Sequence, residues 1–380
     1  PKRPQAPQTA DQMRAAFDAP DPLTVGLEEE LMLLDHETLD LAPAARAVLA
    51  ELGGDERFKH ELPASQLEIV SPPLAGAAEA AAFLASARAD LAAGTSDLVR
   101  LAAAGVHPFA AAEGVLNPGP RYERTHAEFG RIARRQLVFG LQVHVAVRPA
   151  DRALAVYNAL RSYLPELLAL AANAPFYEGR DTGLATVRPK LNELLPRQGV
   201  PPSIPSWEAF ADALRWGARA GGVPEPRVWW WELRPHPAWG TLEVRVPDAQ
   251  STVADAAGVI ALVHSLVAWL GERFAAGEEL PVAPTWRIAE NRWQALARGG
   301  DGLLADLETG ATAPARERLH GLIEALGPAA RSLGCERELG YARALADRGG
   351  PERQREAAAD GGMPGLARSL IGSYLEPLTG

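Results

Sequence analysis

The sequence predicts an α+β fold in which helices cover one face of an antiparallel β-sheet. Its short segments rich in β-branched and aromatic residues alternate in polarity, whereas strands buried on both faces of a parallel sheet are continuously apolar. Longer alanine- and leucine-rich segments with helical spacing separate them. The predicted strands are 23–34, 66–70, 137–147, 227–234 and 240–246.

The predicted helices lie between and after these strands. They cover 77–104, 152–172, 207–219 and 252–275, with several short helical stretches after 286. Asp151 and Ser206 stand where helix N-caps are expected, because their side-chain oxygens can accept a first-turn N–H. We predict a disordered leader over 1–20 and a single domain over 21–380, mostly helical from 252 to 380.

Composition narrows the class of protein. The 380 residues include no apolar run long enough to cross a membrane, and the first residues lack the apolar core of a signal peptide. Cys335 is the only cysteine, which excludes an internal disulfide and a thiolate metal site. We therefore predict a cytoplasmic protein without a membrane partner.

The formal net charge of −10 argues against a general nucleic-acid-binding protein, which needs a basic surface. A nucleotide-using enzyme of this charge has to overcome repulsion between its carboxylates and the phosphates. A divalent cation removes that repulsion.

The first strand presents its side chains to two faces, because successive side chains of a strand point in opposite directions. Glu28 and Glu30 share one face. The opposite face is apolar except for Glu29, which strand parity directs away from the other two glutamates. Its apolar members are Val25, Leu27, Leu31 and Leu33.

The same alternation recurs in the other strands. A polar face can simply be solvated, as in many antiparallel sheets. Here, however, it gathers carboxylates, which repel one another unless a cation holds them. Oxygen-rich ligands with little imidazole suit Mg²⁺ or Mn²⁺, and neighbouring arginines suit a phosphoryl group. The set is Glu28, Glu30, Glu68, His144, Glu232, Arg234, Glu243 and Arg245.

Several familiar sites are missing from the sequence. It contains no GxxxxGK[ST] loop, no GxGxxG after a strand, no HExxH and no GxSxG. Any use of a nucleotide must therefore depend on metal ions and arginines on the sheet.

A series of motifs, in order from about residue 20 to about residue 300, resembles the type 2 glutamate–cysteine ligases, the carboxylate–amine ligase family. They are VGLEEELMLLD, ELPASQLEIVSPP, GVHPFA, QVHVAV, ANAPFYEGRDTGLATVR, WWWELRPHPAWGTLEVRVPDAQ and ENRWQALARGG. The resemblance implies one catalytic domain of the glutamine synthetase type, whose curved antiparallel sheet holds ATP and Mg²⁺ on its concave face. ATP would phosphorylate the γ-carboxylate of glutamate, and the amine of cysteine would displace phosphate to give γ-glutamylcysteine.

The resemblance also implies roles for individual residues. Arg245 would stabilise the transferred phosphoryl group. Arg234, which the polar sheet face selects without the resemblance, is predicted to help bind the nucleotide. Arg188, in the motif DTGLATVR, would hold a carboxylate or phosphate of a substrate. Glu61 rests on the resemblance alone, whereas the polar sheet face already selects the other metal ligands. The implied ligands of Mg²⁺ (or Mn²⁺) are Glu28, Glu30, Glu61, Glu68, His144 and Glu243.

Other residues have both a structural and a functional interpretation. His107 precedes a proline and suits a turn, Cys335 suits a buried apolar position, and the row Trp229–Trp231 suits sheet packing, with adenine stacking as the alternative. Arg121 and Tyr122 follow a Pro/Gly-rich loop and could form a lid. Asn291, Arg292 and Trp293 suit helix packing, with a site as the alternative.

Three classes of function remain open. The first is the ligase, with cysteine or another amine and glutamate or another carboxylate as small-molecule substrates. The second is a metal-dependent phosphohydrolase that uses the same carboxylates to activate water. The third is a nucleotide sensor without turnover. The sequence identifies neither a general base nor the number of chains in an assembly, so a homo-oligomer also remains open.

Overall fold

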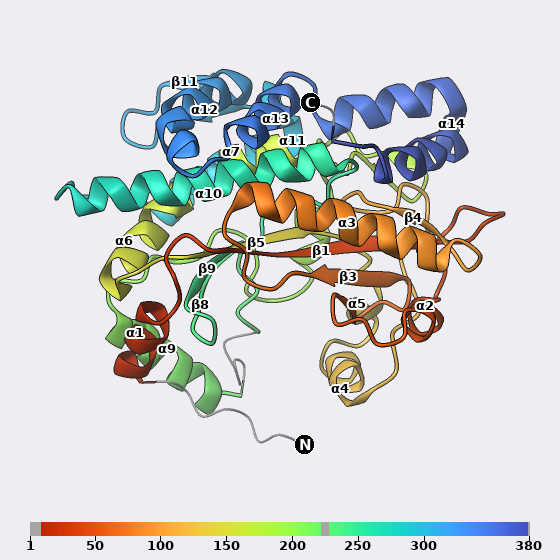
Figure 1. Ribbon diagram of the computed structural model, residues 1–380, viewed down its shortest axis with the longest axis horizontal. Helices are drawn as coiled ribbons and strands as arrows, with labels where there is room; N and C mark the ends of the chain where they lie inside the picture. Colours follow the sequence, from red (N-terminus) through yellow and green to blue (C-terminus); the bar gives the residue numbers. More distant parts are fainter. Residues whose placement is uncertain (1–8, 222–227, 379–380) are drawn as a thin grey trace.

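The computed structural model describes residues 9–221 and 228–378, and its centre is an antiparallel sheet (Figure 1). The strand order is β2-β3-β1-β5-β9-β8, and β4 pairs with the far half of β1. Both edges of β1 are therefore occupied, so this strand is the middle of the sheet. The strands are β1 (Val25–Leu34), β2 (Phe58–His60), β3 (Gln66–Val70), β4 (Arg100–Ala102), β5 (Leu141–Ala146), β8 (Leu233–His236) and β9 (Thr241–Val244).

Helices α3 (Ala77–Thr95) and α10 (Val253–Ala275) cover one face of the sheet (Figure 1). Among the described residues, α10 alone is long and apolar enough to cross a membrane, but 89% of its most apolar stretch is buried inside the protein. It is therefore a core helix. The α+β class, with an antiparallel sheet and helices on one face, is confirmed.

A second helical layer lies over α10. It contains α7 (Leu164–Ala171), α11 (Thr285–Arg298), α12 (Ala315–Ser332), α13 (Glu336–Asp347) and α14 (Gly350–Tyr374) (Figure 1). The small hairpin of β10 (Leu303–Ala305) and β11 (Thr312–Pro314) joins α11 to α12. The region after 252 is thus mostly helical, as predicted.

Shorter elements surround the opposite face of the sheet. At one end, α1 (Ala10–Asp18) and α9 (Trp207–Arg219) lie near the β8–β9 hairpin, and α4 (Pro120–Phe129) and α5 (Arg131–Arg134) lie at the other end (Figure 1). The remaining elements are α2 (Ala45–Glu51), α6 (Ala150–Leu160), the 3-10 helix η1 (Arg161–Tyr163), β6 (Phe176–Tyr177), β7 (Arg180–Asp181), α8 (Arg188–Asn192) and η3 (Gly299–Asp301).

The predicted disordered leader over 1–20 is wrong for residues 10–18, which form α1. Thr9 caps this helix, and Gln12 completes a capping box with it. Met13 and Phe17, one turn apart, are fully buried, and Phe17 packs on Trp207. Two apolar side chains on one helical face supply the burial that a disordered segment lacks. Residues 1–8 lie outside the described part of the chain.

The helix predicted over 77–104 is too long, because α3 ends at Thr95 and Arg100–Ala102 form β4. The physical reason is that part of one edge of β1 lacks another pairing partner. Along this edge, β5 pairs with β1 only as far as Glu29, which leaves Met32–Leu34 to pair with β4. An apolar run of this length has no periodicity that separates a short strand from a helix.

The predicted strands 137–147 and 227–234 differ most from the observed ones. Of 137–147, only Leu141–Ala146 is a strand, and β8 begins at Leu233 because Glu232 donates its N–H to the Gly199 carbonyl of a loop. Residue 227, the start of that prediction, lies outside the described residues. Ser206 caps α9 as predicted, whereas Pro149 stands at the N-cap of α6 and Asp151 in its first turn. The helix predicted over 152–172 is interrupted by η1.

Candidate functional site

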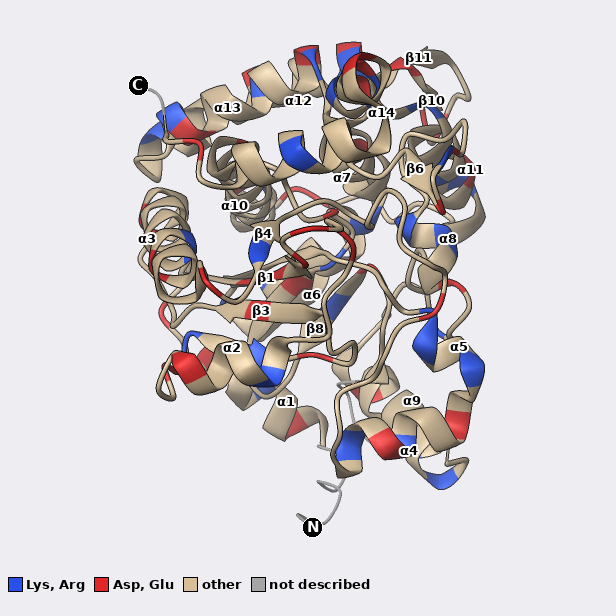
Figure 2. Cartoon of the chain, turned by 90° about the vertical axis from the view of Figure 1, so that its right-hand side faces the viewer, with Lys and Arg blue, Asp and Glu red and all other residues tan. Residues whose placement is uncertain are grey.

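The register of the sheet gathers acidic side chains on the face opposite α3 and α10. Glu30 is aligned with Glu68 across β1 and β3, and His144 with Glu243 across β5 and β9. Glu28 is aligned with Gln142, which lies two residues before His144 on β5. Figure 2 shows acidic segments of β1 and β3 at the centre of the molecule.

Glu28, His144 and Glu243 form the tightest acidic group. One ligand atom from each lies within 4.8 Å of the other two. Nε2 of His144 is 3.6 Å from Oε1 of Glu28 and, although buried, has no hydrogen-bond partner among the described residues. The other ring nitrogen, Nδ1, lies 3.0 Å from Oγ1 of Thr241. Thr241 therefore fixes the ring, and Nε2 remains available as a metal ligand.

Glu30, Glu61 and Glu68 form a second acidic group beside the first. Burial raises the pKa of Glu30 to about 7. Burial, and then the charges of Glu28, Glu61 and Glu30, hold the pKa of Glu68 well above its ordinary value. Burial also raises the pKa of Glu61. Burial is the main reason that these carboxyl groups resist ionisation, and repulsion between neighbouring carboxylates adds to it.

Two arginines provide positive charge at Glu243. Arg234 binds both oxygens of this carboxylate, at 2.6 and 3.0 Å, and Arg245 contacts Oε1 and also Gln142. Burial acts to raise the pKa of Glu243, but the two guanidinium groups hold it well below its ordinary value. The structure thus places both predicted nucleotide-binding arginines beside a predicted metal ligand, and Arg234 is itself buried.

Arg188 lies farther along the same face, at the start of α8. Its guanidinium donates to the carbonyls of Val246 and Arg245, at 3.3 and 3.4 Å, and lies 3.6 Å from Oδ1 of Asp248. The absence of a side chain at Gly140 makes room for it, because a Cβ there would stand 2.2 Å from Arg188 Nη2. Sequence reasoning missed both Asp248 and Gly140. The available signal for Gly140 was a glycine inside a predicted strand, which can mark the close approach of another group.

A cavity of about 590 Å³ opens next to the second acidic group. Glu30, Glu61, Arg188 and Arg245 are among its lining residues, so four of the predicted site residues share one cavity. Polar groups that sequence reasoning did not select also line it: Gln66, Gln136, Asn192 and Gln198.

Helix α4 forms one wall of this cavity, and none of the residues of α4 is buried. Arg121 lies 3.8 Å from Glu61, and the Tyr122 hydroxyl donates to the His60 carbonyl at 3.1 Å. The predicted position of Arg121 and Tyr122 beside the site therefore agrees with the structure, whereas their action as a lid stays a prediction.

The residue excluded by strand parity, Glu29, lies on the core face. It is fully buried and paired with Arg88 of α3, whose Nε donates to its Oε2 at 2.9 Å. Its exclusion from the ligand set is supported by this geometry. The burial of Arg88 was not predicted, because the sequence of an alanine-rich helix does not indicate which arginine points into the core.

Other candidates have structural roles. Backbone groups occupy both ring nitrogens of His107, which fixes a turn, and Asn291 pairs with both backbone groups of Ala305. Arg292 is buried against Glu232 and Glu193. Cys335 is buried, as predicted.

The tryptophan row divides between core and site. Trp229 packs on Phe210, with ring centroids 5.0 Å apart. Trp230 lines the cavity and lies beside Phe129, at 5.8 Å. Packing is therefore confirmed for Trp229, and Trp230 is the member of the row that the cavity could use.

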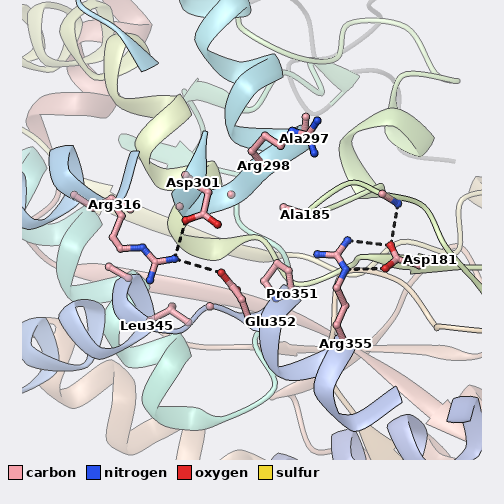
Figure 3. Close-up of a pocket in the computed structure, with 17 residues that line it drawn as sticks. Asp181, Ala185, Ala297, Arg298, Asp301, Arg316, Leu345, Pro351, Glu352 and Arg355 are labelled. Carbon is pink, nitrogen blue, oxygen red and sulfur yellow. Dashed lines mark hydrogen bonds and ion pairs between the residues drawn. The ribbon is translucent and has the colours of Figure 1, made fainter. Parts of the chain in front are cut away.

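A smaller cavity of about 340 Å³ lies among the outer helices, away from the sheet face (Figure 3). Arg316 pairs with Asp301 and Glu352, and Arg355 pairs with both oxygens of Asp181. Because these charges neutralise one another, they offer little to a charged ligand.

The two acidic groups fit a hard divalent cation. Their donors are carboxylate oxygens and one imidazole, the set that suits Mg²⁺ or Mn²⁺. The buried Nε2 of His144 has no hydrogen-bond partner among the described residues, and burial raises the pKa values of Glu30 and Glu68. A divalent cation would give Nε2 a partner and would favour the ionised form of these carboxyl groups.

Known proteins resemble this chain over most of its length. The family described as Glutamate-cysteine ligase family 2 (GCS2) matches residues 24–369. "Putative glutamate--cysteine ligase 2-3" of Rubrobacter xylanophilus is 40% identical over 97% of this chain and 100% of its own length. "Putative glutamate--cysteine ligase 2" of Thermobifida fusca is 34% identical over 92% and 90%.

A solved structure has the same fold. The glutamate–cysteine ligase of Francisella tularensis, in complex with AMP, superposes with a TM-score of 0.64 at 12% identity, covering 93% of this chain and 89% of its own. The match over residues 24–369 identifies the chain as a member of glutamate–cysteine ligase family 2, a ligase of the carboxylate–amine type.

Proposed function

We propose that the protein joins glutamate to cysteine in an ATP- and Mg²⁺-dependent reaction that passes through γ-glutamyl phosphate and releases ADP. The carrying observation is the juxtaposition of the triad Glu28–His144–Glu243 with Arg245 at the edge of a cavity. The family supports the ligase chemistry, and the AMP bound to the Francisella tularensis enzyme favours an adenine nucleotide as co-substrate.

The geometry supports the following assignment of metal ligands. Glu28, His144 and Glu243 would hold one Mg²⁺, and the second acidic group (Glu30, Glu61 and Glu68) would hold another. When bound, Mg²⁺ supplies positive charge that neutralises phosphate oxygens during phosphoryl transfer.

The arginines have complementary tasks in this proposal. Arg245 lies between Glu243 and the cavity, where its guanidinium would stabilise negative charge on the transferred phosphoryl group. Arg188 would orient a substrate carboxylate, because a planar guanidinium can bind both oxygens of a carboxylate. Phosphorylation turns a poor leaving oxygen of the γ-carboxylate into phosphate, which the incoming amine then displaces.

The test measures ADP release from ATP, Mg²⁺ and glutamate with cysteine and a panel of other amines, and identifies the product by mass. We expect ADP release that needs both an amine and a carboxylate. Release of phosphate without an amine would instead support the phosphohydrolase, and nucleotide binding without turnover across the panel would support the sensor.

Three further properties stay predictions. They are the cytoplasmic location, the single catalytic domain over 21–380 and the absence of nucleic-acid and membrane partners. The mass of the protein in solution would decide whether identical chains associate.

A further inference from the structure

An exposed tryptophan stands at the end of the sheet nearest the metal triad. Trp239, in the turn between β8 and β9, is 52% exposed. Its indole stacks on His236, with ring centroids 4.5 Å apart and planes inclined by 20°. His144 of the triad is its other ring neighbour, at 5.1 Å.

The strand register places this indole on the site face. His236 is aligned with Thr241 of β9, and Arg234, two residues earlier on β8, is aligned with Glu243. Because side chains two apart on a strand share a face, His236 lies on the same face as Arg234. Trp239, which stacks on His236, therefore borders the metal triad.

The triad separates Trp239 from the large cavity. Along β9 the order is Trp239 in the turn, then Glu243 of the triad, then Arg245 at the cavity. Figure 1 shows the β8–β9 hairpin beside α1, at the opposite end of the sheet from α4, which walls the cavity. A ligand with phosphates at the triad can thus extend towards the indole without entering the cavity.

The turn that carries Trp239 is held in place. Gly240 has φ +66°, and a Cβ at this position would stand 2.1 Å from the carbonyl oxygen of Ala16 in α1. The N–H groups of both Trp239 and Gly240 donate to the carbonyl of His236. The backbone of the turn therefore packs directly on α1 and presents the indole in a fixed position.

A flat aromatic surface of this kind suits a nucleobase. Bases stack on exposed aromatic side chains because both have planar π-systems. An indole supported by an imidazole on one face can receive a base on the other. The alternative explanation is that Trp239 only shields His236 and His144 from water. In that case its replacement would not change nucleotide affinity, and this difference separates the two explanations.

We propose that Trp239 is the stacking platform for the adenine of ATP. The base of the nucleotide lies on the indole, and its phosphates would lie beside the Mg²⁺ that Glu28, His144 and Glu243 would hold, which leaves the cavity to the carboxylate and amine substrates. This inference rests on the proposed use of ATP. It assigns adenine stacking to Trp239 instead of Trp230, which lines the cavity.

The test measures the affinity of purified protein for ADP with Mg²⁺ by titration calorimetry, without glutamate or amine. One stacked base contributes on the order of tenfold in affinity. We expect W239L to raise the ADP dissociation constant by about that factor and W239F to keep most of the affinity. W286L is the control, because Trp286 is 65% exposed on α11 and lines neither of the two cavities described above.

Steady-state kinetics complete the test. W239L should raise the KM for ATP and leave the KM for glutamate unchanged. If W239L binds ADP like the wild type, or if W230L weakens ADP binding in its place, the assignment is overturned while the ligase proposal stands. A wild-type protein that neither binds ADP nor turns over ATP would overturn both.

Discussion

Replacing Arg88 by methionine should strongly destabilise the folded protein. Arg88 and Glu29 are both fully buried, so the substitution leaves a carboxylate in the core without its counterion. The loss of one partner of a buried ion pair costs about 3–5 kcal/mol.

Arg88 has further partners that Glu29 does not share. Its guanidinium donates to the carbonyls of Gln250 at 2.7 Å and Tyr374 at 3.1 Å, and it lies 4.7 Å from the centre of the Tyr374 ring. R88M therefore also removes donors from buried carbonyls, at about 1 kcal/mol for each hydrogen bond. E29Q, in contrast, leaves Arg88 its carbonyl partners and should cost less.

The assay is urea-induced unfolding of the wild type, R88M, E29Q and the double variant. We expect R88M to lose about 3–5 kcal/mol or more in free energy of unfolding, E29Q to lose less, and the double variant to lose less than the sum. A loss below about 1 kcal/mol for R88M, or full additivity of the two single losses, would refute the interpretation of this pair as a coupled buried ion pair.

Three other predictions concern the site and the core. E28Q should abolish ADP release with little change in the urea midpoint, because Glu28 is partly exposed, and turnover near the wild-type rate would remove Glu28 from the ligand set. E243Q should also lower stability, because Arg234 loses the negative charge of a buried ion-pair partner. G140A should displace the Arg188 guanidinium and raise the KM for the carboxylate substrate by roughly 10- to 100-fold, and an unchanged KM would count against a substrate role for Arg188. Burial lowers the pKa of His264 from 6.5 to about 4, so the unfolded chain takes up a proton as the pH falls below 6.5 while the folded protein stays neutral until about pH 4. The contribution of His264 to the free energy of unfolding should therefore decrease by about 1.4 kcal/mol for each unit by which the pH falls in this window. The difference in unfolding free energy between wild type and H264Q should shrink by the same amount. A constant difference from about pH 7 to about pH 4.5 would contradict this.

Period-two alternation was enough to predict which face of the sheet carries the acidic side chains. It separated Glu29 from Glu28 and Glu30 because neighbours on a strand must point in opposite directions. The structure places Glu29 in the core, as that rule requires. Alternation could not reach Glu61, which lies just outside a strand and follows from the resemblance alone.

The missed features depend on contacts distant in sequence. Whether Arg100–Ala102 form a strand is decided by the free edge of β1, some seventy residues earlier. Helix α1 is stable because Phe17 finds Trp207, and Arg188 is placed by Asp248 and by the space at Gly140. The pattern of neighbouring residues in the sequence does not indicate such partners, because the same residues would be solvated in another fold.

The most apolar helix of the protein also sets a condition on its folding. Helix α10 is as apolar as a membrane span, and α3 and α6, which precede it in the chain, cover only part of its surface. Its most extensive packing partner is α13, which is synthesised about sixty residues after α10 ends. Until then a long apolar surface stays in contact with water, and chains in this state can associate through it. Soluble yield should therefore depend on how soon Glu336–Asp347 reach α10, and chaperones that shield nascent apolar helices should raise it.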